Sequence, residues 1–449
     1  MSLRAIDTPR PAAGDYLQGR GQAWFALAMT IGLMVFDYID RQIIVSLFPH
    51  LKAAWGLSDK ELGALVSVIS LTVALGVIPV ALFADRVNRV KSIVVMALIW
   101  SLATISCMFT RSYSQLLTAR SIVGLGEAGY GSVGAALIAT HFPERLRGTV
   151  LAAFFASASV GSVLGVMLGG VIAARWGWQA AFGVVGIPGL LVAILYLKVR
   201  DYRTVGLALP TERTAENQGS ARRVAATLFR SPTMLIVCIG AAAELIVVSA
   251  IWSWLPSFLN RVHGIAPDAA GIKAALVVLC GAVGSVIWGA VVDRAGARGA
   301  VARFSTLALL CVLAGAVLAF AFGAPLLGFS FSPQVQFALI ALGGFLMTCT
   351  VGPATAVVID VTHPGFRSTG CSLLALFQNL FGLAAGPFLA GMLSDAWGLE
   401  NALAVIPAFS VVAAIAFLIA VRSYERDRLR AGEDASKPAP AAAARPAIA

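Results

Sequence analysis

The sequence predicts an all-α membrane protein with twelve transmembrane helices in two pseudo-symmetric six-helix bundles. Composition is the first observation behind this prediction. The 449 residues are 59% hydrophobic and 12% charged, with a mean hydropathy of +0.86, far from the balance of a soluble globular domain. The second observation is that apolar runs recur along the chain, and the third is that polar loop motifs occur once in each half.

Each apolar run is long enough for the roughly 20 residues that a bilayer-spanning helix needs. Continuous runs of this length argue against a membrane β-barrel, whose strands alternate apolar and polar residues. We expect the twelve spans near residues 21–48, 60–84, 91–110, 112–140, 148–174, 179–199, 232–260, 267–292, 300–323, 333–361, 368–393 and 400–422.

The net charge of +11 follows the predicted topology and does not indicate a nucleic-acid partner. With the N-terminus inside, the basic residues of the cytoplasmic loops are Arg86, Arg89, Lys91, Arg145, Arg147, Arg294, Arg298, Arg303 and Arg367. The opposite loops contain only Lys52, Lys60, Arg111, Arg175 and Arg261. This asymmetry predicts a multi-pass protein of the cell membrane with both termini in the cytoplasm.

Polar segments flank the two predicted bundles, which cover residues 21–200 and 231–425. Residues 1–20 are polar, and we expect a cytoplasmic tail without a signal peptide. Residues 201–230 carry charges, prolines and glycines and are expected to form a cytoplasmic linker. Residues 426–449 include a Pro/Ala-rich stretch, for which we expect disorder.

Two loop motifs occur at equivalent places in the two halves. "ALFADRVNRVK" after the second span matches "GAVVDRAGARG" after the eighth, which aligns Asp85 with Asp293. "FPERLRG" after the fourth span matches "HPGFRSTG" after the tenth. Two matches in the same order indicate a duplicated six-helix unit, as expected of a secondary transporter with parallel repeats.

The Asp-Arg loops resemble the G-x-x-x-D-R-x-G-R-R signature of the major facilitator superfamily, and the resemblance covers residues 21–425. The second copy supplies Gly289, Asp293, Arg294, Gly296 and Arg298. The first copy keeps Asp85, Arg86 and Arg89 but has Ala81 and Asn88 at the glycine positions.

An aspartate at a helix end beside arginines of a neighbouring helix can form a charge-assisted latch in one conformation only. Ordinary positive-inside flanking is the alternative for a single loop, and the duplication favours the latch. The latch residues we expect are Asp85, Arg86, Arg89, Asp293, Arg294 and Arg298.

Few ionisable residues lie inside the predicted spans, where each costs roughly 2.5–3.5 kcal/mol on insertion scales. The first span has Asp37, Asp40 and Arg41, which share one helix face because they are three and four residues apart. The fourth span has Arg120 and Glu127 on one face. We expect an Asp40-Arg41 pair to meet Arg120 and Glu127, with Asp37 outside that pair.

Three carboxylates accompany two guanidiniums in this set, so at least one carboxylate lacks a full partner and can bind a proton. We therefore predict that Asp37, Asp40, Arg41, Arg120 and Glu127 serve in proton coupling and gating. A purely structural ion-pair cluster is the alternative, which is less favoured because buried pairs add little net stability over apolar packing.

The stretch "RSIVGLGEAGYGSVG" contains G-x-G-x-x-G at Gly124, Gly126 and Gly129 but lacks the preceding strand of a dinucleotide-binding fold. In an apolar helix these glycines predict close helix contact instead. The stretch "GSVLGVMLGG" resembles the glycine-rich signature of the superfamily's antiporters, with Val166 at the proline position.

Three segments together resemble the Spinster-type branch of the superfamily: "DYIDRQ", "ADRVNR" and "RSIVGLGEAGY". That branch has R-x-x-x-G-x-G-E-A-S-Y in its fourth helix, so Gly129 stands in place of a serine. The resemblance implies that Asp40, Arg41, Arg120 and Glu127 couple protons and gate transport. It also implies lipid-like substrates such as lysophospholipids or sphingoid phosphates.

An amphipathic substrate pocket is predicted from aromatic and polar residues within the spans. Pro256 is expected to kink or break the helix that carries the two tryptophans of this set. An interfacial aromatic belt and interhelical hydrogen bonding by the amides are the alternatives. The predicted substrate-binding residues are Tyr38, Tyr130, Trp252, Trp254, Gln378, Asn379 and Glu244.

Together these features predict a proton-coupled secondary transporter that moves an amphipathic, lipid-like organic substrate by alternating access. The alternative is a proton symporter for a small organic anion or sugar acid, whose carboxylate pairs with Arg41 or Arg120. An enzyme is not expected, because HExxH, GxSxG and Walker A motifs are absent. We expect protons and membrane lipid as partners, a monomer, and neither a cofactor, a metal nor a nucleic acid.

Overall fold

The computed structural model describes residues 16, 19–86, 89–200, 231–325, 328–329, 332–362 and 367–436. All regular secondary structure in these ranges is helical. Twelve helices in these ranges are long and apolar enough to cross a membrane, which confirms the predicted all-α fold with twelve spans. The described residues form two compact units: unit 1 comprises those up to residue 200 and residues 255–278, and unit 2 comprises residues 231–254 and those from 279 to 436.

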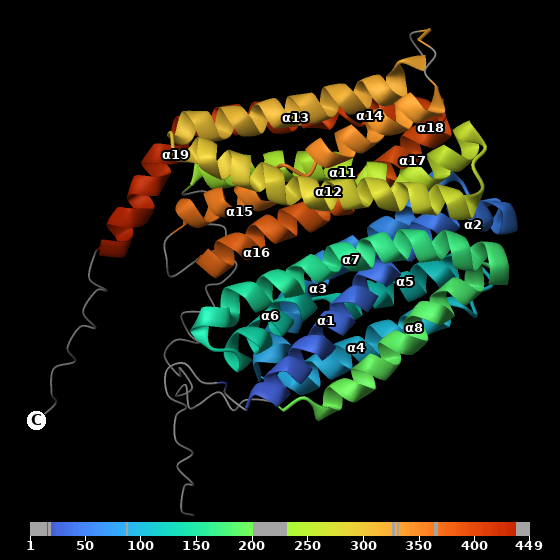
Figure 1. Cartoon of the computed structure of the whole chain (residues 1–449), viewed down its shortest axis with the longest axis horizontal. Helices are drawn as coiled ribbons and strands as arrows, with labels where there is room; N and C mark the ends of the chain where they lie inside the picture. Colours follow the sequence, from blue (N-terminus) through green and yellow to red (C-terminus); the bar gives the residue numbers. More distant parts are fainter. Residues whose placement is uncertain are drawn as a thin grey trace, which may run out of the picture. The chain divides into compact units, whose positions relative to one another are not determined.

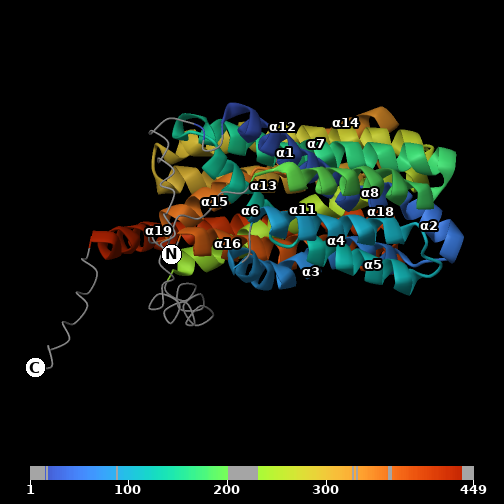
Figure 2. The ribbon, with the colours of Figure 1, turned by 90° about the horizontal axis from the view of Figure 1, so that it is seen from below.

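Unit 1 contains the first six spans. Its elements are α1 (Arg20–Ile43), η1 (Ile44–Leu47), α2 (Phe48–Trp55), α3 (Asp59–Arg86), α4 (Arg89–Cys107), α5 (Tyr113–Glu127), α6 (Tyr130–His141), α7 (Glu144–Trp176), α8 (Trp178–Leu195) and η2 (Tyr196–Lys198). Helix α1 packs against α7 and α8, and Figure 2 shows α4 between α8 and α5.

Unit 2 contains most of the remaining six spans. Its elements are α11 (Pro232–His263), α12 (Pro267–Gly296), α13 (Ala300–Gly323), α14 (Pro333–Leu346), α15 (Val351–Asp360), α16 (Arg367–Phe377), the π-helical η5 (Gln378–Leu383), α17 (Ala385–Trp397), α18 (Leu399–Val405) and α19 (Ala408–Ser436). Figure 1 shows α13 beside α14 and α18, which it contacts. The end of α11 and the start of α12 group with unit 1, and α11 continues as a helix through Pro256.

Glycines on one face of α7 bring this helix against α1. Gly161, Gly165 and Gly169 recur every four residues, so they lie on the same side of the helix. A Cβ added to Gly165 would lie 2.6 Å from the carbonyl oxygen of Ile39, and similarly close approaches occur one turn before and one turn after it. The glycine-rich stretch of the fifth span therefore fixes the position of the helix that carries Asp37, Asp40 and Arg41.

Several spans are interrupted where the sequence predicts continuous helices, among them the fourth and the tenth. In the fourth span α5 ends at Glu127 and α6 starts at Tyr130. Gly129 between them has φ +89°, a conformation that favours glycine because it has no Cβ. The tenth span is divided similarly between α14 and α15. The two breaks fall in spans that correspond in the sequence repeat, and discontinuous helices are a recurring feature of secondary transporters.

The last helix runs further than the sequence predicts. Helix α19 continues to Ser436, so the expected disorder is wrong for residues 426–436. Buried Asp427 accepts hydrogen bonds from the backbone N of Thr233 and the Oγ of Ser231, both 3.1 Å long. Asp427 thereby caps the start of α11 and connects α19 to it. The predicted linker, residues 201–230, and residues 437–449 lie outside the described ranges, as do residues 1–15 of the predicted N-terminal tail.

Replacing Gly165 with alanine should destabilise the protein by about 1–3 kcal/mol, because the added methyl would meet the backbone of α1. Gly148 on the same helix is exposed and has no atom within 4 Å of an added Cβ, so Gly148→Ala is the matched control. Thermal unfolding in detergent measures both variants. Equal melting temperatures for the two would contradict the close packing of α1 and α7.

Candidate functional site

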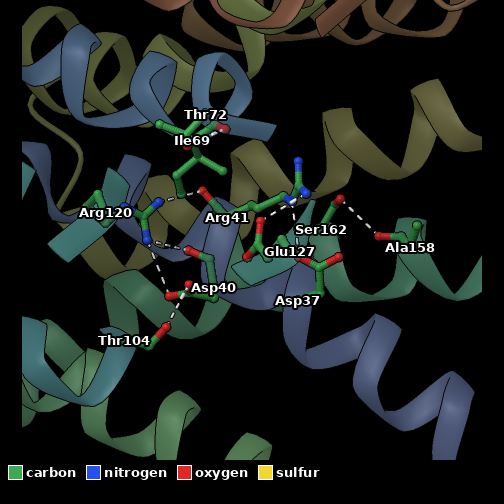
Figure 3. A network of polar contacts seen from close by, with 10 residues as sticks. All are labelled: Asp37, Asp40, Arg41, Ile69, Thr72, Thr104, Arg120, Glu127, Ala158 and Ser162. Atoms are coloured by element: carbon green, nitrogen blue, oxygen red, sulfur yellow. Dashed lines mark hydrogen bonds and ion pairs between the residues drawn. The ribbon is translucent and has the colours of Figure 1, made fainter. Parts of the chain in front are cut away.

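Arg120 joins α5 to α1 in the interior of unit 1. Its side chain has no exposed surface. Its Nη1 donates to the backbone oxygen of Asp40 at 3.0 Å and to the Asp40 Oδ1 at 3.3 Å, and its Nη2 donates to the backbone oxygen of Arg41 at 3.4 Å. The Thr104 Oγ1 of α4 donates to the other Asp40 oxygen at 2.8 Å (Figure 3). Asp40 and Arg120 therefore form a buried, electrically balanced pair.

Arg41 contacts two carboxylates on the other side of the same cluster (Figure 3). Its Nε donates to the Asp37 Oδ1 at 3.1 Å, and its Nη2 lies 2.9 Å from the Glu127 Oε2. The Glu127 side chain has no exposed surface, whereas that of Arg41 is 18% exposed. Two carboxylates share one guanidinium here, so this group has a net charge of −1 when both carboxylates are ionised.

Of the three carboxylates, Glu127 is held by the fewest hydrogen bonds. Neither of its oxygens makes a hydrogen bond of good geometry to another described residue, although Arg41 lies at ion-pair distance. Glu127 is also the last residue of α5. The negative end of a helix dipole disfavours a carboxylate at this position. A proton on Glu127 would remove both the surplus charge and this unfavourable interaction.

The five sequence-predicted residues form two groups of contacts, and these groups separate Asp40 from Arg41, which were expected to act as a pair. Arg41 meets Glu127 and Asp40 meets Arg120, so the charged faces of the first and fourth spans do lie together. Asp37, which was expected outside the pair, is the hydrogen-bond acceptor of Arg41. The reason is the four-residue spacing of Asp37 and Arg41, which stacks them on one helix face, while Asp40 turns toward Arg120. Thr104 was not singled out in the sequence, because one threonine in an apolar helix carries no pattern.

Of the predicted substrate-binding residues, Tyr130, Trp254 and Glu244 are fully buried. The Tyr130 hydroxyl donates to the Thr30 backbone oxygen at 2.6 Å, and the Trp254 Nε1 donates to the Pro387 backbone oxygen at 3.0 Å. These three side chains pack within their own units and present no open face to a substrate in this structure. Their role in substrate binding stays a prediction, since an aromatic residue within a span has the same sequence signature whether it packs inside the protein or binds a substrate.

The other four predicted binding residues keep accessible surface. The Tyr38 ring lies under the Arg41 guanidinium, 5.3 Å from its carbon to the ring centroid. Trp252 is partly exposed, and its Nε1 has no hydrogen-bond partner among the described residues. Gln378 and Asn379 begin the π-helical turn η5, and the Asn379 amide donates to the Ala375 backbone oxygen at 2.8 Å. Such π-helical turns occur frequently at functional sites.

In unit 2 the partner of Asp293 is Arg303, which was not among the predicted latch residues. Arg303 donates to the Asp360 Oδ2 at 2.7 Å, and the Tyr424 hydroxyl donates to the same oxygen at 2.9 Å. Asp293 is 64% exposed, and Arg303 is its ion-pair partner at 3.9 Å. Arg294 and Arg298 are exposed, and their predicted role in a latch stays a prediction. In the first copy Arg89 begins α4, whereas the side chains of Asp85 and Arg86 lie outside the described ones.

No group of three or more His, Cys, Asp or Glu residues within the described ranges is placed to hold a metal ion. The carboxylates and guanidiniums of the charged cluster can bind protons and form ion pairs. A proton at the Asp37-Arg41-Glu127 group would change the Arg41–Glu127 ion pair, which connects α1 to α5.

Comparison with known proteins gives a family and a fold. A sequence profile of the Major Facilitator Superfamily matches residues 30–332 and 238–448. The gallate transporter of Pseudomonas putida is 25% identical, over 89% of this chain and 93% of its own. Protein spinster homolog 1 of Xenopus laevis is 26% identical, over 88% of this chain and 80% of its own.

A solved structure gives the same fold. The crystal structure of a bacterial homolog to the human lysosomal transporter Spinster, inward-facing and unoccupied, superposes with a TM-score of 0.81. The alignment covers 91% of this chain and 99% of that chain at 23% sequence identity.

Replacing Arg120 with glutamine should destabilise the folded protein by about 3–5 kcal/mol, because Asp40 would remain buried without its counter-charge. The double variant Arg120→Gln with Asp40→Asn removes both charges and should recover much of that loss. Melting temperatures of the two single variants and the double variant form a double-mutant cycle. Additive losses in the double variant would show that the two side chains are not coupled.

Proposed function

The chain belongs to the Major Facilitator Superfamily, and we propose that it is a proton-coupled secondary transporter of an amphipathic organic substrate. The single observation that carries this proposal is that Arg41 is shared between Asp37 and Glu127 inside the membrane-embedded part of unit 1. An uncompensated charge in such a site is unfavourable. One proton on the Asp37-Arg41-Glu127 group makes it neutral, so proton occupancy sets its charge.

The proton acts through the Arg41 guanidinium. With Glu127 ionised, Arg41 ties α1 to the end of α5. With Glu127 protonated, Arg41 stays paired with Asp37 of the same helix, and the Arg41 Nη2 can bind another anionic group. Proton binding then favours binding of an anionic group of the cargo, and this linkage couples the two through alternating access.

The ring of Tyr38 under Arg41 adds an apolar surface beside the cation. This combination fits a cargo with an anionic group and an apolar body. The resemblance to the Spinster-type branch, and the similarity to a spinster homolog, favour a lipid-like amphiphile as this cargo. A small organic anion is the second candidate, which the similarity to a gallate transporter favours.

Proteoliposomes with an imposed pH gradient decide between the two. Accumulation of a lysolipid that depends on the gradient supports the first candidate, and accumulation of an aromatic or sugar acid supports the second. If the flux of both lysolipids and acids does not depend on the pH gradient, proton coupling is ruled out.

Glu127→Gln should abolish proton-driven accumulation and leave exchange of cargo across the membrane, because the amide cannot take up a proton. Accumulation under a pH gradient and counterflow of labelled cargo without one are the two measurements. Equal loss of both would assign Glu127 a purely structural role.

Asp37→Asn should flatten the pH dependence of uptake, because the Arg41-Glu127 pair is then balanced without a proton. Asp40→Asn should instead lower the melting temperature, because it leaves Arg120 buried without its carboxylate. Initial uptake rates across a pH series, together with thermal unfolding, separate the two variants. A flat profile for Asp40→Asn and an unchanged one for Asp37→Asn would reverse the assignment.

A further inference from the structure

A second cluster of charges lies away from the Arg41 site, also within unit 1. Asp59 is the first residue of α3, and its side chain is 5% exposed. Arg261 in the last turn of α11 holds it with two hydrogen bonds, Nη1 to Oδ2 at 2.6 Å and Nη2 to Oδ1 at 2.9 Å. Lys52 of α2 donates to Oδ1 at 2.6 Å. One carboxylate therefore lies between two cations.

The two cations are more accessible than the carboxylate between them. The Lys52 side chain is 41% exposed and that of Arg261 is 25% exposed. The sequence places both on the side of the membrane predicted to face away from the cytoplasm. An anion arriving from that side meets Lys52 and Arg261 before it meets Asp59.

The end of α11 and the start of α12, residues 260–271, form a corner that packs tightly on α7. The corner is closed by the Asn260 amide, which donates to the Ile265 backbone oxygen at 2.8 Å. A Cβ on Gly170 of α7 would lie 2.6 Å from the Pro267 backbone oxygen, and one on Gly271 of α12 would lie 2.8 Å from the Val166 backbone oxygen. Such contact leaves no room between α7 and the start of α12, so the corner must move as a body if it moves at all.

We propose that Arg261 and Lys52 form a carboxylate-binding site at this corner, which Asp59 occupies in the present structure. An organic carboxylate that takes the place of Asp59 would release the corner from α2 and α3. Asp59 stands in for the ligand. The Arg261 guanidinium donates two parallel hydrogen bonds to its two oxygens. This planar, bidentate geometry is the one in which arginine binds carboxylates well.

The charges of the two cations support the exchange. A ligand carboxylate that replaces the Asp59 carboxylate brings the same charge to Lys52 and Arg261. The proposal rests on the proposed function and deepens it, because it names Lys52 and Arg261 as the residues that an anionic cargo meets first. It concerns binding and opening only, so it can be tested without transport or a pH gradient.

Ser46 provides the reporter for this test. It is 1% exposed, donates to the Val166 backbone oxygen at 2.6 Å, and lies 3.3 Å from the position of a Cβ on Gly271. Ser46→Cys in the full chain should react slowly with a membrane-impermeant maleimide. Benzoate on the outer side of the membrane should raise the labelling rate about fivefold or more, as measured by mass spectrometry of the Ser46 peptide.

Arg261→Gln should raise labelling of the reporter without benzoate and remove the response to benzoate. Asp59→Asn breaks the same contact from the other side and replaces Arg261→Gln if that variant does not fold. Arg175→Gln is the matched control, because Arg175 is an exposed basic residue of the same predicted side. It should label like the parent and keep the full benzoate response.

Hydrogen–deuterium exchange of residues 44–56 repeats the measurement in a chain without the reporter cysteine. Parent-like labelling in Arg261→Gln, or a benzoate response that persists in it, would overturn the proposal. Inorganic phosphate as effective as benzoate at equal concentration would overturn the assignment to carboxylates.

Discussion

A guanidinium without exposed surface is stable inside a helical bundle only when its charge is balanced and its N–H groups have acceptors. The Asp40 carboxylate balances the charge of Arg120, and this carboxylate and two backbone oxygens of α1 accept hydrogen bonds from its two Nη groups, while its Nε has no hydrogen-bond partner among the described residues. These contacts fix α5 against α1, since a shift by one helical turn would remove all of them. The glycine face of α7 supports α1 from another side, so the helix that carries most of the cluster has little freedom.

The position of Arg41 follows from this arrangement. Once Asp40 is engaged by Arg120 and Thr104, the carboxylates that remain for Arg41 are Asp37 and Glu127. The surplus negative charge of the cluster is thereby confined to one group of three residues. The break after Glu127 places that carboxylate at the end of α5. Balanced and unbalanced charges therefore occupy adjacent parts of one cluster.

The two sequence repeats share architecture and differ in their polar residues. Both interrupt their fourth span, and both pack helices closely at glycines. The Arg120–Asp40 pair, both of whose side chains are buried, lies in unit 1, whereas buried Glu244 in unit 2 makes no ion pair with a described residue. Unit 2 instead has the π-helical turn at Gln378 and the Arg303-Asp360-Tyr424 network near the helix ends. Duplication thus preserved the helical framework while the chemistry of the two halves diverged.

The sequence by itself determined the class of the protein, its twelve spans and its duplicated units, because hydrophobic length and repeated loop motifs are local properties of the chain. It also identified the five charged residues of the cluster, since charge inside an apolar helix is conspicuous. Only the tertiary structure decided which carboxylate meets which arginine, because spacing along one helix does not give the rotation of its neighbour. The same limit separates buried Tyr130 and Trp254 from accessible Tyr38 and Trp252. It also explains why Asp59 and Arg261, 202 residues apart, could be recognised as partners only after folding brought them together.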